Sequence, residues 1–385
     1  MPALVAPPFP WTDVWGQDEA VATLRAAASD PASLSHAWLI TGPPGSGRST
    51  LAYAFAATLI AGGGGDEATM RQVLAGTHPD VTVLRTEKVI ISIAEARALV
   101  ERSYFAPSAG RYRVIVIEDA DRMTERTSNV LLKALEEPPE QTIWVLCAPS
   151  EADLLPTIRS RVRPLRLREP DVDDVARLIA HRTGSDAATA ESAARHAQRH
   201  IGMAQRLATD SAARERRDET LRGVLGVRGV GTAVETAGRI VQLATDDAKA
   251  RTAERDEAER AALLRAVGVA EGKPVPPAVR TQVSALEEDQ KRRATRSLRD
   301  GIDRVLTDLQ SLFRDVVMVQ FGRSGDLINR ELAEEIHRVA EAWTVSRTLV
   351  VLDDIADTRA ALERNVAPVL ALESLMVTVA SGRKP

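Results

Sequence analysis

The residues best suited to chemistry form a glycine-rich stretch, GPPGSGRS, over residues 42–49. It matches the phosphate-binding pattern G-x-x-x-x-G-K-[ST] at every fixed position except that of the lysine, where Arg48 stands. The backbone N–H groups of such a loop, together with the N-terminus of the following helix, can bind phosphate oxygens. A planar guanidinium replaces the compact lysine ammonium poorly beside the β- and γ-phosphates. The stretch therefore predicts a nucleotide-binding loop with impaired catalysis.

A second set of candidates follows an apolar run at residues 114–117, where Glu118 and Asp119 come directly after the run. An acidic pair at the end of a buried strand is where P-loop ATPases hold Mg²⁺ and polarise the attacking water. The usual order is Asp then Glu, and the inverted order shifts both carboxylates enough to lower a reaction rate strongly. The predicted nucleotide-site residues are Gly42, Gly45, Gly47, Arg48, Ser49, Thr50, Glu118 and Asp119.

Strand-like and helix-like segments alternate up to about residue 168. Short β-branched runs between helices predict an α/β domain with a parallel sheet and crossover helices. The expected strands are Trp38–Thr41, Val81–Leu84, Val114–Ile117, Thr142–Cys147 and Val162–Leu167. The expected helices are Glu19–Ala28, Ser49–Leu59, Ile93–Ser103 and Thr127–Leu135. The glycine run Gly62–Gly65 is expected to be a flexible break.

The pattern becomes purely helical after residue 168. Its clearest element is an amphipathic stripe from Ile302 to Val317, which ends before Gly322. A later helical stretch, Leu352–Val377, is interrupted by Pro368. The remaining expected features are the helices Val172–His181 and Ala187–His200 and an exposed loop over Gly268–Pro277.

Composition limits the class of protein. The net charge of −4 and the pI of about 6.0 give no global basic field, although partners in an assembly could supply a positive surface for DNA. A single cysteine, Cys147, excludes an internal disulfide and a four-cysteine zinc site. His36, His78 and His200 have no ligand-like neighbours in the sequence. No signal peptide and no apolar run near the roughly 18 residues of a membrane span is present, so we expect a cytoplasmic protein without membrane contact.

Two further segments complete a recognisable set. One is a helix that ends in a double proline, Asn129–Pro139, and the other is Thr157–Arg161, just before the last expected strand. Together with residues 42–49 and Glu118–Met123, they resemble the clamp-loader branch of the AAA+ ATPases. The likeness covers residues 1 to about 210 and is highly specific in combination. The helical remainder fits such a subunit by its position alone.

The resemblance implies a RecA-like nucleotide-binding domain (1–168), a helical lid (169–210) and a helical collar or oligomerisation domain (211–385). It also implies a place in a hetero-pentamer with ATP-hydrolysing gamma/tau subunits and a delta subunit. Such a complex loads a sliding clamp on primed DNA.

Several positions depart from the family pattern. Besides Arg48 and the inverted acidic pair, Ala148 stands where a polar sensor is usual and Gln205 where a second sensor has arginine. The resemblance therefore implies a largely non-hydrolysing subunit to which ATP binds weakly or not at all. The family's zinc ribbon follows the loop helix, but residues 61–72 contain no cysteine. No zinc is expected.

Arg161 is the residue to which the resemblance gives a catalytic role. Ser160-Arg161 occupies the position of an arginine finger, which acts in trans by stabilising charge on the γ-phosphate of a neighbour's ATP. The alternative is a salt-bridged surface arginine.

Two other functions compete with this reading. An active motor, such as a gamma/tau-like ATPase or a branch-migration helicase, would favour an intact lysine, an Asp-Glu order and a polar sensor, and all three are missing. A stand-alone signalling ATPase would leave Asn129–Pro139 and Ser160–Arg161 without a role.

Overall fold

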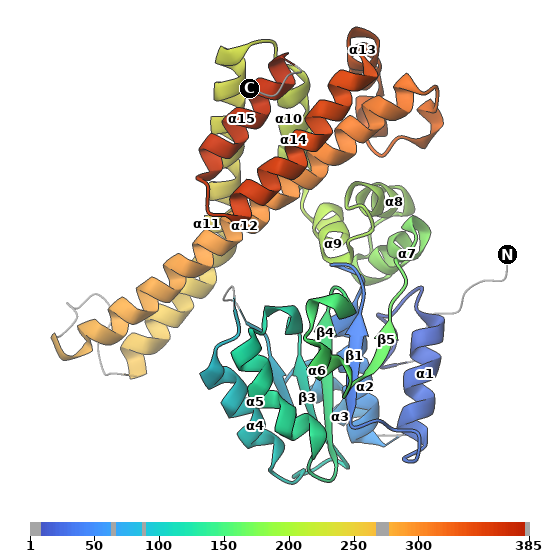
Figure 1. Cartoon of the computed structure of the whole chain (residues 1–385), viewed down its shortest axis with the longest axis vertical. Helices are drawn as coiled ribbons and strands as arrows, with labels where there is room; N and C mark the ends of the chain where they lie inside the picture. The colour runs from blue at the N-terminus through green and yellow to red at the C-terminus, as the bar shows by residue number, and fades with distance from the viewer. Residues whose placement is uncertain (1–8, 63–66, 87–89, 267–276, 382–385) are drawn as a thin grey trace. The chain divides into compact units, whose positions relative to one another are not determined.

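A five-stranded parallel sheet forms the centre of the amino-terminal part, in the order β2-β3-β4-β1-β5 (Figure 1). Its strands are β1 (Ala37–Thr41), β2 (Val81–Leu84), β3 (Arg113–Ile117), β4 (Thr142–Ala148) and β5 (Arg163–Arg166). Every residue of β1, β3 and β4 is buried, as expected for parallel strands covered on both faces. β5 is an edge strand that pairs with β1 in the register Leu39 to Pro164. The predicted parallel sheet is confirmed.

This computed structural model describes residues 9–62, 67–86, 90–266 and 277–381. The chain divides into two compact units, residues 1–209 and residues 210–385. Most of the predicted Gly62–Gly65 break and of the predicted Gly268–Pro277 loop lies outside the described residues.

Helices cover both faces of the sheet. The strand residues alternate between the faces, so that Trp38 and Ile40 pack in one core and Leu39 packs in the other. The first core receives α1 (Asp18–Ser29), α2 (Arg48–Ala61) and α3 (Glu67–Leu74). The second core receives α4 (Ile93–Ser103), α5 (Glu125–Glu136) and α6 (Pro156–Arg159). This layering leaves the carboxyl ends of the strands for the loops that carry the candidate site.

Three short helices complete the first unit. They are α7 (Val172–Thr183), α8 (Ala187–His196) and α9 (Ile201–Thr209). The expected continuation of the second helix to His200 is wrong, because Gln198 and Arg199 take positive φ angles of 47° and 69°. That left-handed turn ends α8 and starts α9 in a new direction.

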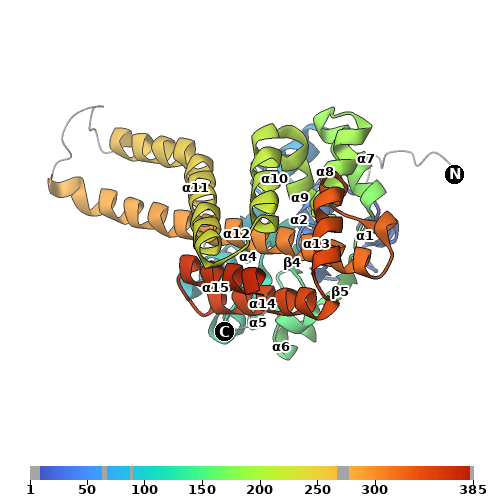
Figure 2. The ribbon, with the colours of Figure 1, turned by 90° about the horizontal axis from the view of Figure 1, so that it is seen from above.

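The second unit is built of helices (Figure 2). They are α10 (Ser211–Leu225), α11 (Val230–Ala266), α12 (Pro277–Gln320), α13 (Ala333–Ala342), α14 (Val345–Glu363) and α15 (Pro368–Ser381). The predicted stripe lies on α12, where Ile302, Leu309 and Phe313 are buried in the core of this unit. Pro368 begins α15, which explains the interruption in the expected Leu352–Val377 helix.

The outer parts of α11 and α12 run side by side as a long hairpin (Figures 1 and 2). Arg293 joins the two helices, because its Nη2 donates to Asp256 at 2.9 Å and its Nη1 donates to Glu259 at 3.0 Å. Across the described parts of the chain, no helix combines the length and the apolar character needed to cross a bilayer.

Candidate functional site

The glycine-rich loop lies between the carboxyl end of β1 and the N-terminus of α2. Gly45 and Gly47 have φ angles of +78° and +92°, a region that favours glycine. The N–H of Gly42 donates to the carbonyl of Ala148 at 3.4 Å, which ties the start of the loop to the end of β4. The backbone therefore has the turn geometry of a phosphate-binding loop at a helix N-terminus.

Arg48 is held by the loop itself. Its Nη1 donates to the carbonyl oxygen of Gly42 at 2.9 Å. Nearby Cys147 is fully buried, and this burial raises the pKa of its thiol to about 12. The thiol is therefore protonated at neutral pH and is no nucleophile.

Both carboxylate oxygens of Glu118 accept hydrogen bonds from α2. The Ser49 hydroxyl donates to Oε2 at 3.3 Å, and the Tyr53 hydroxyl donates to Oε1. The more distant Arg85 Nε lies 3.9 Å from Oε2. Burial raises the pKa of Tyr53, and its bond to Glu118 adds to this effect, so Tyr53 remains a donor. The hydroxyl and the carboxylate that would bind Mg²⁺ are thus hydrogen-bonded to each other, and the carboxylate also accepts a hydrogen bond from Tyr53.

The second carboxylate of the pair, Asp119, faces a different partner. It lies 3.7 Å from Nη1 of Arg122, three residues further along the chain. The structure therefore places Glu118 against the loop and Asp119 in a local ion pair.

The segment between α8 and α9 covers the loop. The N–H of Ile201 donates to the carbonyl of Gly45 at 3.1 Å. The imidazole of His200 lies so close that a Cβ atom on Gly45 would be 2.4 Å from its Cγ. His200, to which the sequence analysis gave no role, is thus part of this site. Of the two sensor positions, Ala148 is buried at the end of β4 and Gln205 is exposed on α9.

The backbone N–H groups of the loop can hold an anion, and the side chains beside the loop are engaged by protein partners. Arg48 donates to the loop carbonyl, and both oxygens of Glu118 are engaged. Within the described residues there is also no cluster of three or more His, Cys, Asp or Glu side chains that could hold a metal ion.

Arg161 lies just after α6, and its hydrogen bonds go to α5 and to its own turn. Its Nε donates to Oε1 of Glu136 at 2.8 Å, and its Nη1 donates to the carbonyl of Thr157 at 2.7 Å and to Ser160 Oγ at 3.0 Å. Its side chain is 30% exposed. The structure does not bring Arg161 to the glycine-rich loop.

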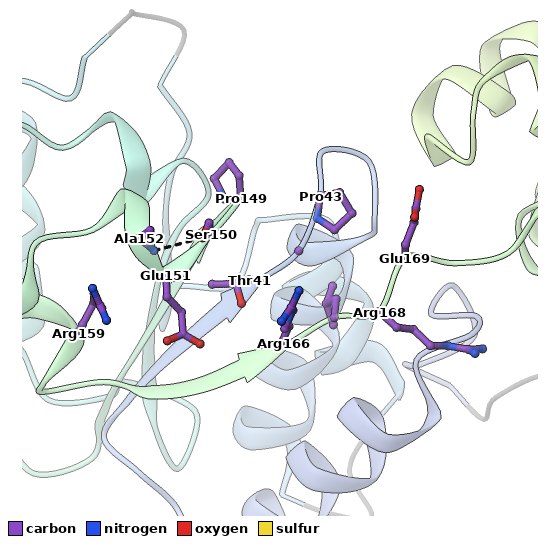
Figure 3. Close-up of a pocket in the computed structure, with 12 residues that line it drawn as sticks. Thr41, Pro43, Pro149, Ser150, Glu151, Ala152, Arg159, Arg166, Arg168 and Glu169 are labelled. Atoms are coloured by element: carbon purple, nitrogen blue, oxygen red, sulfur yellow. Dashed lines mark hydrogen bonds between the residues drawn. The ribbon is translucent and has the colours of Figure 1, made fainter. Parts of the chain in front are cut away.

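A pocket of about 920 Å³ adjoins the first turn of the loop (Figure 3). Arg159 and Arg166 line it, and neither guanidinium has a hydrogen bond or ion pair with a described residue, whereas Arg168 donates to Asp174 at 2.9 Å. The other lining residues include Thr41, Pro43, Ser150, Glu151 and Glu169. This pocket was not predicted, although the arginine-rich run at residues 159–168 is a signal for it.

Two protein families and several known proteins resemble parts of this chain. Residues 16–171 match the family described as "DNA polymerase III, delta subunit", and residues 295–380 match "DNA polymerase III, delta subunit, C terminal". The DNA polymerase III subunit delta' of Pseudomonas aeruginosa is 37% identical over 135 residues, which are 33% of this chain and 41% of that protein. The subunit gamma/tau of Mycobacterium tuberculosis is 31% identical over 172 residues, 42% of this chain and 30% of that protein.

The chain therefore matches less than half of the length of either relative. A solved structure of a gamma subunit-related protein of Thermotoga maritima aligns with 94% of this chain and all of that one, at 16% identity and a TM-score of 0.43. The expected resemblance to clamp-loader subunits of DNA polymerase III is confirmed by the family matches, which include the loop, the acidic pair and Arg161.

Proposed function

We propose, from the match of residues 16–171 and 295–380 to the DNA polymerase III delta-subunit families, that this chain is a delta-prime type subunit of a clamp loader. It acts in the cytoplasm, in a hetero-pentamer with gamma/tau and delta subunits. The complex loads a sliding clamp on primed DNA. The observation that carries the proposal is a phosphate-binding loop with internally engaged side chains, on the same unit as the Ser160-Arg161 segment.

In this proposal the chain does not hydrolyse ATP. In P-loop ATPases a loop hydroxyl and a strand-end carboxylate hold the Mg²⁺ ion. Glu118 and Ser49 bind each other here, and Tyr53 occupies the second oxygen of Glu118. Any nucleotide that binds does so weakly, through the backbone of the loop, after the contact between His200 and Gly45 has opened.

Arg161 acts on the ATP of the neighbouring subunit. At rest its guanidinium is held by Glu136, so reaching a γ-phosphate means exchanging a carboxylate for a phosphate. Both are anions that accept paired hydrogen bonds from arginine, so the exchange costs little charge stabilisation. Glu136 is then a positioning residue that keeps Arg161 ordered until the neighbour's nucleotide arrives.

The rival function is an active motor. The similarity of this chain to a gamma/tau subunit is the observation that favours it. Reconstitution with the gamma/tau and delta subunits of the same organism separates the two. We expect the chain to join the complex, to be required for clamp loading on primed circular DNA, and to show negligible ATPase alone. A chain that replaces gamma/tau in loading, or that hydrolyses ATP by itself, would overturn the proposal.

A further inference from the structure

A pocket of about 570 Å³ lies in the second unit, among residues that the proposed function does not use. It is formed by the end of α10, the turn after it, α13, the start of α14 and the end of α15. The lining residues are Arg222, Leu225, Gly226, Val227, Arg228, Glu335, Arg338, Val339, Ala342, Trp343, Arg347 and Ala380.

The charges around this pocket are unbalanced. Four arginines line it, and Glu335 is its one acidic lining residue. The nearest approach between Glu335 and Arg222 is 4.0 Å, at the limit of an ion pair. Arg338 is exposed and has no hydrogen bond or ion pair with any residue that the structure describes. The pocket thus holds a net positive charge that the described chain does not neutralise.

Two of the arginines are fixed by backbone carbonyls. Arg347 Nη2 donates to the carbonyls of Val379 and Ala380 at 3.0 and 3.1 Å, at the end of α15. Arg228 Nη1 donates to the carbonyls of Leu225 and Val227 at 2.7 and 3.1 Å. Nε of Arg347 is buried and has no hydrogen-bond partner among the residues that the structure describes. Carbonyl dipoles orient these guanidiniums but do not cancel their charge, so an added anion would be stabilised.

The remainder of the lining is apolar and offers no free aromatic face. Leu225, Val227 and Val339 are buried there. The ring of Trp343 stacks on Phe313 with centroids 5.7 Å apart, and the guanidinium carbon of Arg347 lies 3.9 Å from its centroid. Single-stranded nucleic acids bind by stacking bases on open aromatic rings. Trp343 is already stacked between Phe313 and Arg347, which argues against a nucleobase, whereas four arginines beside one glutamate suit the carboxylates of an acidic peptide.

We propose that this pocket binds an acidic segment of a partner protein, in which Asp or Glu stands next to an apolar residue. The carboxylate pairs with Arg338 and Arg222, and the apolar side chain packs on Ala342, which is exposed in the lining. This inference does not depend on the proposed clamp-loader function, because it uses only residues of the second unit.

The test is fluorescence anisotropy of the full chain with a labelled hexapeptide of alternating Asp and Leu. Arg338→Gln and Arg222→Gln should each weaken binding about tenfold or more, because each removes a charged hydrogen bond to the carboxylates. The matched control is Arg280→Gln, an exposed arginine of α12 outside the pocket, and it should bind like the unaltered chain. Circular dichroism verifies that each variant is folded.

The outcomes separate the possibilities. Saturable binding that is lost in both pocket variants, is retained in Arg280→Gln, and is absent for an Asn-Leu hexapeptide supports the proposal. Three results would overturn it: no saturable binding of the Asp-Leu peptide, equal weakening in Arg280→Gln, or tighter binding of an unstructured oligothymidylate through Arg338 and Arg222.

Discussion

The guanidinium of Arg161 and the carboxylate of Glu136 form a two-bond contact, in which Nε and Nη2 of the arginine both donate to Oε1 of the glutamate. Glu136 is the last residue of α5, and Arg161 follows α6 by two residues. The contact therefore anchors the segment before β5 to the helix that ends in the double proline. Because the pair is partly exposed, we assign it little stabilisation of the fold.

Arg161→Ala should lower the DNA-stimulated ATPase of the reconstituted complex without dissociating it. Arginine fingers raise kcat by a factor of about 10³–10⁵ at their own ATP site. The single ATP site that faces this chain should therefore lose nearly all of its hydrolysis. Total turnover should fall only partly, and clamp loading should fall further if it needs every site. Arg161→Lys should not restore the activity, because a point charge replaces a planar fork.

The matched control for Arg161 is Arg126→Ala, which removes an exposed arginine from α5 of the same unit. Its ATPase and loading rates should equal those of the unaltered complex. Unchanged rates in an assembled Arg161→Ala complex would show that Arg161 is only a surface arginine.

The isolated chain should hydrolyse ATP negligibly, and Arg48→Lys alone should not restore hydrolysis. The reason is that Ser49 and Tyr53 still engage both oxygens of Glu118. Phosphate release is the measurement, with Gly47→Asp as the control that blocks the loop. Steady turnover on the order of 1 s⁻¹, within the range of ordinary phosphoryl-transfer enzymes, that disappears in Gly47→Asp would contradict this prediction.

Gly45→Ala should destabilise the first unit more than Gly184→Ala does. Both glycines have positive φ angles, of +78° and +68°, so each alanine carries a backbone cost of about 1–2 kcal/mol. Only at Gly45 does the added Cβ meet a neighbour, at 2.4 Å from His200, whereas nothing lies within 4 Å at Gly184. Urea unfolding of the full chain measures the difference, and adding His200→Ala to Gly45→Ala should remove the excess. Equal costs for the two glycines would show that His200 can move away freely.

Asp80 should make stability depend on pH in acid. Burial tends to raise its pKa, but backbone N–H donors of Gly110, Ser108 and Ala109 outweigh this effect and lower the pKa to about 2. A depressed folded-state pKa adds stability above the unfolded value near 4, and that stability is lost as the pH falls toward 2.

Asp80→Asn should therefore cost about 2 kcal/mol or more in free energy of unfolding at pH 7, and this difference should shrink between pH 5 and pH 2. Asp173→Asn is the control, since Asp173 is an exposed carboxylate in the first turn of α7. A cost that is constant with pH would mean that packing, and not ionisation, explains the Asp80 effect.

The strands could be predicted to within two residues, because short β-branched runs bounded by turns leave little freedom for a buried parallel strand. The short helix α3 was not predicted, since its eight residues bury only Met70 and Val73. The predicted end of α8 was too late. The turn that ends the helix has Gln198 and Arg199 in left-handed conformations, so no glycine marks it in the sequence.

The candidate site was less predictable than the fold. Tyr53 stands four residues after Ser49, on the same helical face, so its place near the loop could have been noticed. Its contact with Glu118 could not, because the strand order puts β4 between β1 and β3 and only the assembled sheet brings these segments together. The same holds for His200, which reaches the loop through the turn after α8.

The edge strand β5 bears on self-association. Leu167 donates its N–H to Thr41 on the β1 side, and donors alternate along a strand, so residues 164 and 166 direct their nitrogens toward the open edge. Proline has no N–H, so Pro164 offers no donor to an incoming strand. Arg163 and Arg166, both exposed, add charge along the same strand. β5 is thus protected against the edge-to-edge pairing that leads to aggregation.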